Sequence, residues 1–278
     1  MTTPYAHPEV LVETDWVKQN LGKPGIKLVE IDVDTQAYDA GHIPSAVGFN
    51  WQTQLQDQLN RDIIGKEAFE KLVGGAGISP RDTVILYGDN NNWFAANAFW
   101  LFMVYGHRDV RLMNGGRAKW QREPDKELTT ERPNPKAVPY RVAETRPGLR
   151  ALLPDVLRAV QSRACNLVDV RSTDEYTGKV IAPPGMNESA QRGGHIRGAV
   201  GFNWRTELQD QVGRDIIGQE AFERLVGGAG ISPRDTVILY GDNHNWFAAN
   251  SFWLFKLYGH KDVRLMNGGR AKWQREPD

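Results

Sequence analysis

Two short turns hold the residues of this chain whose types and spacing suit chemistry best. The stretch DTVILYGDN occurs at Asp82–Asn90 and again at Asp235–Asn243, and each copy runs from an apolar strand into a glycine and short polar residues. Backbone N–H groups at a helix start after such a turn form an anion cradle, which the helix dipole strengthens. A thiolate at the first position of the turn would have a lowered pKa and would be a competent nucleophile.

Neither copy carries a nucleophile at that first position, which is Gly88 in one turn and Gly241 in the other. We therefore predict no catalytic residue at either turn. The next residue, Asp242, places a negative charge where an anionic substrate would approach, which is unfavourable unless the charge is neutralised. The candidate anion cradle consists of six residues of the second copy: Gly241, Asp242, Asn243, His244, Asn245 and Trp246.

The only cysteine is Cys165, so an intramolecular disulfide and a cysteine-rich zinc site are excluded. It lies just before the expected strand Asn166–Val170, at the end opposite to the carboxyl edge where ligands of parallel sheets bind. We interpret it as a packed thiol rather than a substitute nucleophile.

The histidines have structural and chemical interpretations. His244 replaces Asn91 and could act as a base or a weak metal ligand, but both residue types also suit a solvent-facing turn. His42 and His195 belong to two GHI motifs and are expected to hold the following loop by hydrogen bonds. Two more histidines follow glycines that end helices, where a positive charge favours the helix C-terminus: His107 and His260.

Apolar periodicity predicts the elements that must position the turns. Short β-rich runs alternate with segments at helical spacing, which predicts an α/β fold with a mostly parallel sheet and helices on both faces. In the first copy the expected strands and helices are Ile26–Val33, Lys66–Val73, Thr83–Tyr87, Trp93–Tyr105 and Val110–Met113. Asn91 or Asn92 is the expected N-cap of the helix that starts near Trp93.

The chain contains a domain-sized internal repeat. Ala46–Asp125 aligns without a gap on Ala199–Asp278, and 69 of these 80 positions are identical. The residues before each copy diverge, so the pattern indicates a tandem duplication followed by recombination, or an assembly artefact. We expect a first domain over 1–125, a proline-rich extended connector over 126–150 and a second domain over 151–278.

Composition excludes several classes of protein. The 278 residues hold 34 Lys and Arg against 34 Asp and Glu, so no global field attracts nucleic acid or an anionic membrane. No basic start, signal-length apolar core or membrane-length apolar run is found in the sequence. The expected location is cytoplasmic.

The motif order resembles the tandem-domain rhodanese family, the thiosulfate sulfurtransferases. The resemblance rests on the paired GHI…AV motifs, LVDVRSTDEY, QRGGHI, and VILYG followed by a helix and NGGRAKW. It implies two rhodanese domains, the first inactive and the second ordinarily carrying a cysteine directly after its central strand. That cysteine takes the outer sulfur of thiosulfate as a persulfide and passes it to cyanide or a thiol.

This chain departs from the family pattern at the cysteine position, Gly241, since its second domain joins a catalytic-type front part to an inactive-type back part. The resemblance places Arg171 and Arg197 beside the loop as candidate substrate contacts, although Arg171 could instead pair with Asp174 or Glu175. It implies small anions such as thiosulfate as ligands. We expect no cofactor or metal, and the balanced charge predicts neither a nucleic-acid nor a membrane partner. The sequence identifies no protein partner.

Three interpretations of function remain open. The first is a sulfurtransferase by descent that is catalytically impaired. The second is a non-enzymatic scaffold that binds anions or a protein. The third is a recombination product without a selected role.

Overall fold

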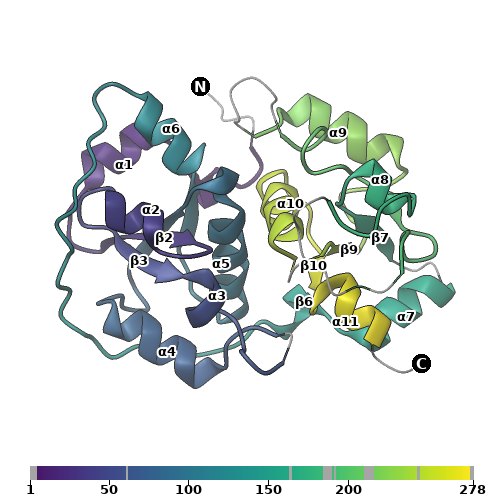
Figure 1. The fold of residues 1–278 in the computed structure, drawn as a ribbon, viewed down its shortest axis with the longest axis horizontal. Coiled ribbons are helices and arrows are strands. Elements are labelled where there is room, and N and C mark those ends of the chain that lie inside the picture. The colour runs from purple at the N-terminus through teal and green to yellow at the C-terminus, as the bar shows by residue number, and fades with distance from the viewer. Residues whose placement is uncertain are drawn as a thin grey trace. The chain divides into compact units, whose positions relative to one another are not determined.

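The computed structural model contains two compact units. One unit is Pro8–Pro147, and the other joins Gly148–Asp278 to Met1–His7 (Figure 1). The description covers residues 5–60, 62–162, 165–183, 190, 192–209, 216–242 and 245–275.

The first unit is built on a five-stranded sheet in which all neighbouring strands are parallel, in the order β1-β5-β4-β2-β3. Its strands are β1 (Leu11–Val12), β2 (Ile26–Asp32), β3 (Val47–Asn50), β4 (Thr83–Tyr87) and β5 (Val110–Met113). Its α-helices are α1 (Thr14–Asn20), α2 (Gln36–Ala40), α3 (Trp51–Gln54), α4 (Lys66–Gly75), α5 (Trp93–Val104) and α6 (Gly116–Arg122). The predicted α/β fold is confirmed.

Successive side chains of a strand point to opposite faces of the sheet. Both faces of this sheet are buried, because consecutive residues of β4 are buried. Ile85 and Tyr87 of β4 pack in one cluster with Val17 of α1 and Trp120 of α6. The intervening Leu86 is also fully buried, and the aromatic helix α5 contacts β2, β4 and β5. The aromatic run of α5 is therefore part of the core.

The second unit repeats this architecture with the strand order β6-β10-β9-β7-β8, again parallel throughout. Its strands are β6 (Arg150–Ala151), β7 (Asn166–Asp169), β8 (Val200–Gly201), β9 (Val237–Tyr240) and β10 (Val263–Met266). Its α-helices are α7 (Leu153–Ser162), α8 (Thr173–Tyr176), α9 (Gln219–Gly228), α10 (Trp246–Leu257) and α11 (Gly269–Arg275).

The proline-rich segment after α6 is extended and packs against the first unit. Tyr140 and Val142 are buried, and Val138 donates its backbone N–H to the carbonyl oxygen of Gly74 in α4 at 2.9 Å. The compact units divide at Pro147, within the expected connector 126–150. Most of this segment belongs to the first unit because it makes contacts with α4 and α5 after leaving α6.

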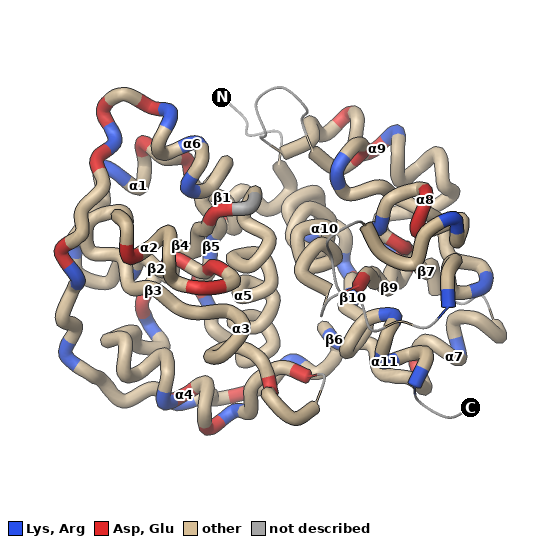
Figure 2. Tube along the Cα trace, viewed as in Figure 1, with Lys and Arg blue, Asp and Glu red and all other residues tan. Residues whose placement is uncertain are grey.

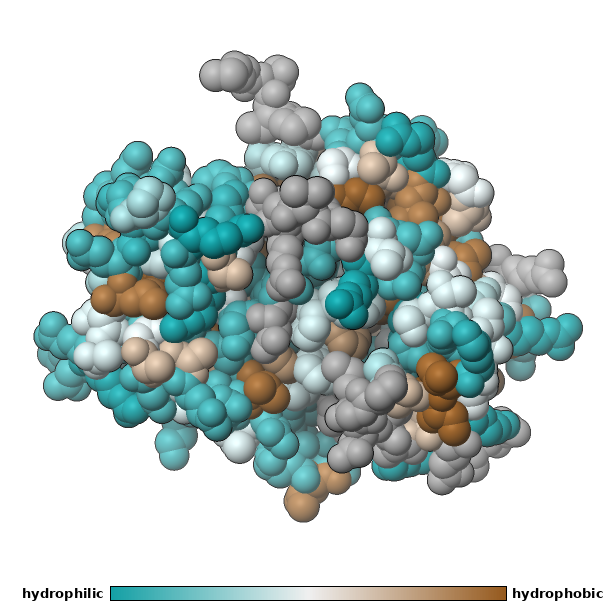
Figure 3. All heavy atoms as spheres, turned by 45° about the horizontal axis from the view of Figure 1, so that its top comes forward, coloured by the Kyte–Doolittle hydropathy of each residue, from teal (hydrophilic) through white to brown (hydrophobic). Residues whose placement is uncertain are grey.

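Charges of both signs are interspersed along each unit (Figure 2), in keeping with the balanced composition. The face drawn in Figure 3 is mainly hydrophilic, with small separate hydrophobic patches. Among the described residues no helix is both long enough and apolar enough to span a bilayer.

Candidate functional site

The loop after β9 begins at Gly241, where the carboxyl end of a central strand meets the start of α10. Gly241 is buried, and its backbone N–H donates to Oδ1 of Asn245 at 2.9 Å while its carbonyl accepts from the N–H of Arg270 at 3.0 Å. Trp246 is the half-buried first residue of α10. Asn243 and His244, also predicted for the cradle, lie outside the described residues.

Asn245 stands at the N-cap position but does not cap α10 with its side chain. Its backbone is left-handed, with φ of 64°, and its amide instead bridges Gly241 to the carbonyl of Met266 in β10. Asn92 joins Gly88 to Met113 in the same way. Asn92 therefore stands at the predicted N-cap position of α5, but its side chain makes no capping bond because the amide closes the loop onto the neighbouring strand.

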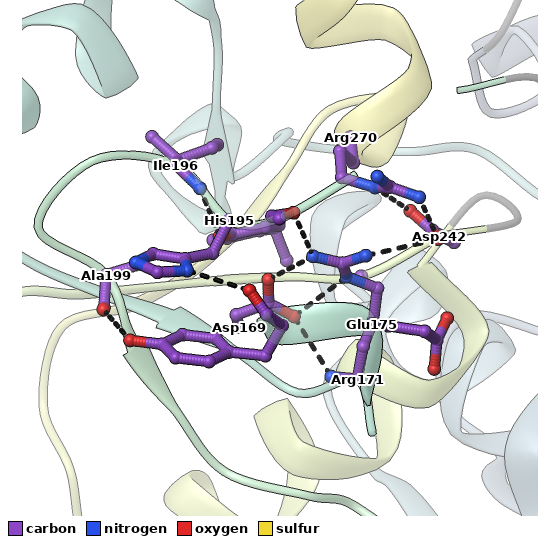
Figure 4. A network of polar contacts seen from close by, with 12 residues as sticks. Asp169, Arg171, Glu175, His195, Ile196, Ala199, Asp242 and Arg270 are labelled. Carbon is purple, nitrogen blue, oxygen red and sulfur yellow. Dashed lines mark hydrogen bonds and ion pairs between the residues drawn. The ribbon is translucent and has the colours of Figure 1, made fainter. Parts of the chain in front are cut away.

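Asp242 is buried between two arginines (Figure 4). Arg270 of α11 donates from Nε to Oδ1 and from Nη2 to Oδ2 of Asp242, both at 2.8 Å. Nη1 of Arg171 lies 3.7 Å from Oδ2 of the same carboxylate. The structure thus supplies the neutralisation that the sequence argument required for a negative charge at this loop.

Arg171, a predicted substrate contact, is fully buried at the end of β7. It pairs with Asp169 through Nε at 3.0 Å and Nη2 at 2.6 Å, not with the alternatives Asp174 or Glu175. Burial lowers the pKa of Arg171, but the hydrogen bonds and charge of Asp169 outweigh it and raise the pKa above the usual value. Its Nη1 is buried without a hydrogen-bond partner among the described residues and faces the loop carboxylate.

Arg197, the second predicted contact, is exposed, and no described residue hydrogen-bonds or ion-pairs with it. His195 stacks on Tyr176 with ring centres 3.8 Å apart, and its Nδ1 lies 2.8 Å from the Tyr176 carbonyl oxygen. His42 stacks on Tyr38 in the same manner. The prediction that these two histidines hold loops by hydrogen bonds is confirmed.

His107 and His260 do not serve as helix-end cations. Both are buried, and burial lowers the pKa of each imidazole, which favours the neutral form. Nδ1 of His107 lies 2.8 Å from the Tyr140 hydroxyl. The backbone N–H of His107 donates to the carbonyl of Phe102, and that of His260 donates to the carbonyl of Phe255. The charge-based interpretation is wrong because the side chains point into the protein rather than into water.

Cys165 lies at the amino end of β7, as predicted. The register pairs Asn166 with Val237 and Asp169 with Tyr240, so the cysteine is beyond the start of β9 and the loop is beyond its end. At a rise of about 3.3 Å per residue, roughly 15 Å of strand separates the two. Cys165 packs against the hydrophobic cluster between the sheet, α7 and α11.

Gly241 and Gly88 differ in the space around them. A Cβ atom at Gly241 would make ordinary contacts, 3.4 Å from Cγ2 of Val170 and 4.0 Å from Cβ of Ala248. A Cβ atom at Gly88 would lie 2.3 Å from the Ile31 carbonyl oxygen and 2.8 Å from Oδ1 of Asp32. The loop of the second unit accepts a side chain at its first position, and the loop of the first unit does not.

The first unit carries a different buried network beside its loop. Arg117, the counterpart of Arg270, pairs with Glu30 of β2 through Nη1 and Oε1 at 2.5 Å. Asp32 stands where the second unit has Arg171 and accepts the backbone N–H of Asp89 at 2.7 Å. Burial, with the charge of Asp89, raises the pKa of Asp32 to about 9, so this carboxyl is protonated at neutral pH.

The described residues contain no group of three or more His, Cys, Asp or Glu side chains arranged to hold a metal ion.

Comparison with known proteins identifies the family to which these units belong. The Rhodanese-like domain model matches residues 13–123 and 153–276, which are most of both units. The chain belongs to the rhodanese family. A protein of Saccharopolyspora erythraea named "Putative thiosulfate sulfurtransferase" is 43% identical over 271 residues, covering 95% of this chain and 93% of its own. The sulfur carrier protein TtuD of Thermus thermophilus is 40% identical over 278 residues, covering 97% and 95%.

Solved structures share the rhodanese fold at low sequence identity. The 3-mercaptopyruvate sulfotransferase SseA of Escherichia coli superposes with a TM-score of 0.80 at 23% identity, covering 94% of this chain and 98% of its own. An anaerobic ergothioneine biosynthesis enzyme of Chlorobium limicola gives a TM-score of 0.86 at 21% identity, covering 98% and 70%. These two likenesses concern the fold alone.

Proposed function

We propose that this rhodanese descends from thiosulfate sulfurtransferases but transfers sulfur weakly or not at all. The observation that carries the proposal is the glycine at position 241, at the head of the loop after β9. The chain's one cysteine lies at the other end of the sheet, too far away to replace a thiolate there. Removing a covalent nucleophile typically costs on the order of 10^4–10^6 in turnover.

The surroundings of Gly241 remain suited to a thiolate. The four charges buried nearest the loop, those of Asp169, Arg171, Asp242 and Arg270, form ion pairs and sum to zero. The amino end of α10 faces the same loop and favours negative charge. A cysteine at position 241 would therefore meet no uncompensated carboxylate and would have a depressed pKa.

In a Gly241→Cys variant, the thiolate would attack the outer sulfur of thiosulfate, the S–S bond would break, and sulfite would leave with the electron pair. Cyanide would then take the outer sulfur of the persulfide, releasing thiocyanate and restoring the thiolate. No metal or redox cofactor takes part in either step.

The test is thiocyanate formation from thiosulfate and cyanide by the native chain, Gly241→Cys and the matched control Gly88→Cys. We expect background rates for the native chain, a gain of about a thousandfold or more for Gly241→Cys, and none for Gly88→Cys, where the side chain does not fit. Clear turnover by the native chain that is lost in Cys165→Ser would refute the proposal.

Anion binding without turnover is a second candidate function. The buried Nη1 of Arg171 makes no hydrogen bond to a described residue and faces the loop carboxylate. A buried guanidinium N–H that lacks a hydrogen bond would be stabilised by an additional acceptor, which an oxyanion would supply. Calorimetric titration of the native chain with thiosulfate tests this, and absence of saturable heat at millimolar concentrations would remove it.

A further inference from the structure

The first unit has an extended segment, residues 128–146, that we call the strap; it runs along the outside of the unit between α6 and β6 (Figure 1). Thr129 and His42 exchange two backbone hydrogen bonds of 2.8 Å. Val138 donates to the Gly74 carbonyl, and Arg146 donates to the Val104 carbonyl at 2.7 Å. The strap therefore lies along a row of backbone acceptors that runs from His42, after α2, past Gly74 to Val104 at the end of α5. We call this surface the track.

Two glycines of this track give the strap its close approach. A Cβ atom at Gly74 would lie 2.6 Å from the carbonyl oxygen of Val138, and one at Gly77 would lie 2.9 Å from Cβ of Pro135. Both distances are shorter than real side chains tolerate. At Gly74 and Gly77 the track exposes backbone without a side chain, and the extended, proline-containing strap lies directly against it.

The second unit carries the same track with the same residues. Gly194, His195, Glu223, Gly227 and Gly230 correspond to Gly41, His42, Glu70, Gly74 and Gly77. Within the part of the chain that the structure describes, an added Cβ atom would meet nothing within 4 Å at Gly194, Gly227 or Gly230.

Exposure confirms that the two tracks differ in occupancy. Gly74, Gly77 and Glu70 are buried in the first unit, whereas their counterparts Gly227, Gly230 and Glu223 are exposed.

The far end of the second track is already occupied by the N-terminal segment. His7 donates its backbone N–H to the Leu257 carbonyl at 3.0 Å, the bond that Arg146 makes to the equivalent Val104. Ala6 lies against Gly259 as Glu144 lies against Gly106. The open part of the track therefore runs from Gly194 to Gly227 and matches strap residues 128–138, LTTERPNPKAV.

We propose that this open track binds an extended, proline-containing peptide segment of a separate protein, with the backbone chemistry of strap residues 128–138. The occupant would donate one N–H to the Gly227 carbonyl and place a proline over Gly230. The strap indicates the chemistry of this occupant, because it lies on a track of matching residues in the same chain. Proline-rich segments suit such sites because they lose little conformational freedom on binding.

The test uses a fluorescent synthetic peptide, LTTERPNPKAV, titrated into the full chain and followed by anisotropy. We expect one saturable site per chain and no saturable binding of a scrambled peptide. The Gly227→Ala variant should bind at least about tenfold more weakly, because its Cβ would meet the peptide carbonyl as the Gly74 geometry shows.

The matched control is Gly228→Ala, one residue along the same helix. A Cβ atom added at Gly228 or at its counterpart Gly75 would meet no atom of a described residue within 4 Å, so this face points away from the strap and binding should be unchanged. Absence of saturable peptide binding, or equal binding by both variants, would overturn the proposal. A concentration-dependent dimer abolished by Gly227→Ala would also overturn it, by assigning the track to a second copy of this chain.

Discussion

The two units place nearly identical loops in different electrostatic surroundings. Arg117 and Arg270 occupy equivalent positions, yet Arg117 pairs with Glu30 of β2 and Arg270 pairs with Asp242 of the loop. The difference comes from the strand beside the central one: β2 ends at Asp32, whereas the counterpart Arg171 lies two residues after the end of β7. The divergent front part of each unit therefore decides what the shared back part can do.

The largest expected effect is a contrast between Asp242→Asn and Asp89→Asn. Asp242 pairs with the buried Arg270 and lies 3.7 Å from Nη1 of Arg171, so its loss would leave a buried charge unpaired and should destabilise the second unit by about 3 kcal/mol. Asp89 is half-buried beside the protonated Asp32, and its replacement should cost the first unit no more than about 1 kcal/mol. Hydrogen exchange of β9 and β4, read by mass spectrometry, measures the two units separately. Equal losses would show that the networks do not differ energetically.

The next contrast is Gly88→Ala against Gly241→Ala. The Cβ at position 88 would collide with the Ile31 carbonyl, which cannot move without displacing β2, so we expect a loss of about 2 kcal/mol in the first unit. The same change at position 241 should cost less than about 1 kcal/mol, since it meets only ordinary contacts. Urea unfolding of both variants provides the measurement, and a reversed order would mean that the loops are not shaped as described.

A pH effect distinguishes the first unit from the second. The folded-state pKa of Asp32 is about 9, above its unfolded value of about 3.9, so the folded state holds a proton that the unfolded state releases. Stability from this group is complete below pH 4 and declines as the pH rises toward 9.

Asp32→Asn should therefore flatten the decline and raise stability at pH 7, by on the order of 1 kcal/mol. Urea midpoints of the native chain and the variant between pH 4.5 and 8.5 give the comparison. If the urea midpoints of the native chain and the variant changed with pH in the same way, the raised pKa assigned to Asp32 would be contradicted.

The smallest effect compares Gly74→Ala with Gly227→Ala. In the first unit the methyl group would push the strap away and should cost about 1 kcal/mol. In the second unit it enters open space, and replacing a helical glycine should stabilise α9 by about 0.5 kcal/mol. Thermal unfolding midpoints that shift in opposite directions would support the difference in track occupancy; shifts of the same sign would not.

The local sequence pattern was sufficient to predict much of the fold of this protein. The strands Thr83–Tyr87 and Val110–Met113 fall where their apolar runs predicted, and the parallel α/β architecture follows from their alternation with helices. The place of Cys165 at the amino end of its strand also followed, because chain direction in a parallel sheet is fixed by the crossover rule.

The sequence by itself determined the family fold, the duplication and the glycine at the nucleophile position, since these depend on residue identity and short-range periodicity. Only the tertiary structure decided that Arg171 pairs with Asp169, that Asn92 closes a loop instead of capping a helix, and that the strap lies on one unit while the matching track of the other is open. Those outcomes depend on which atoms meet between segments that are distant in the sequence. The nearly identical back parts of the two units do not specify these contacts by themselves, because their contact partners lie in segments that differ between the units.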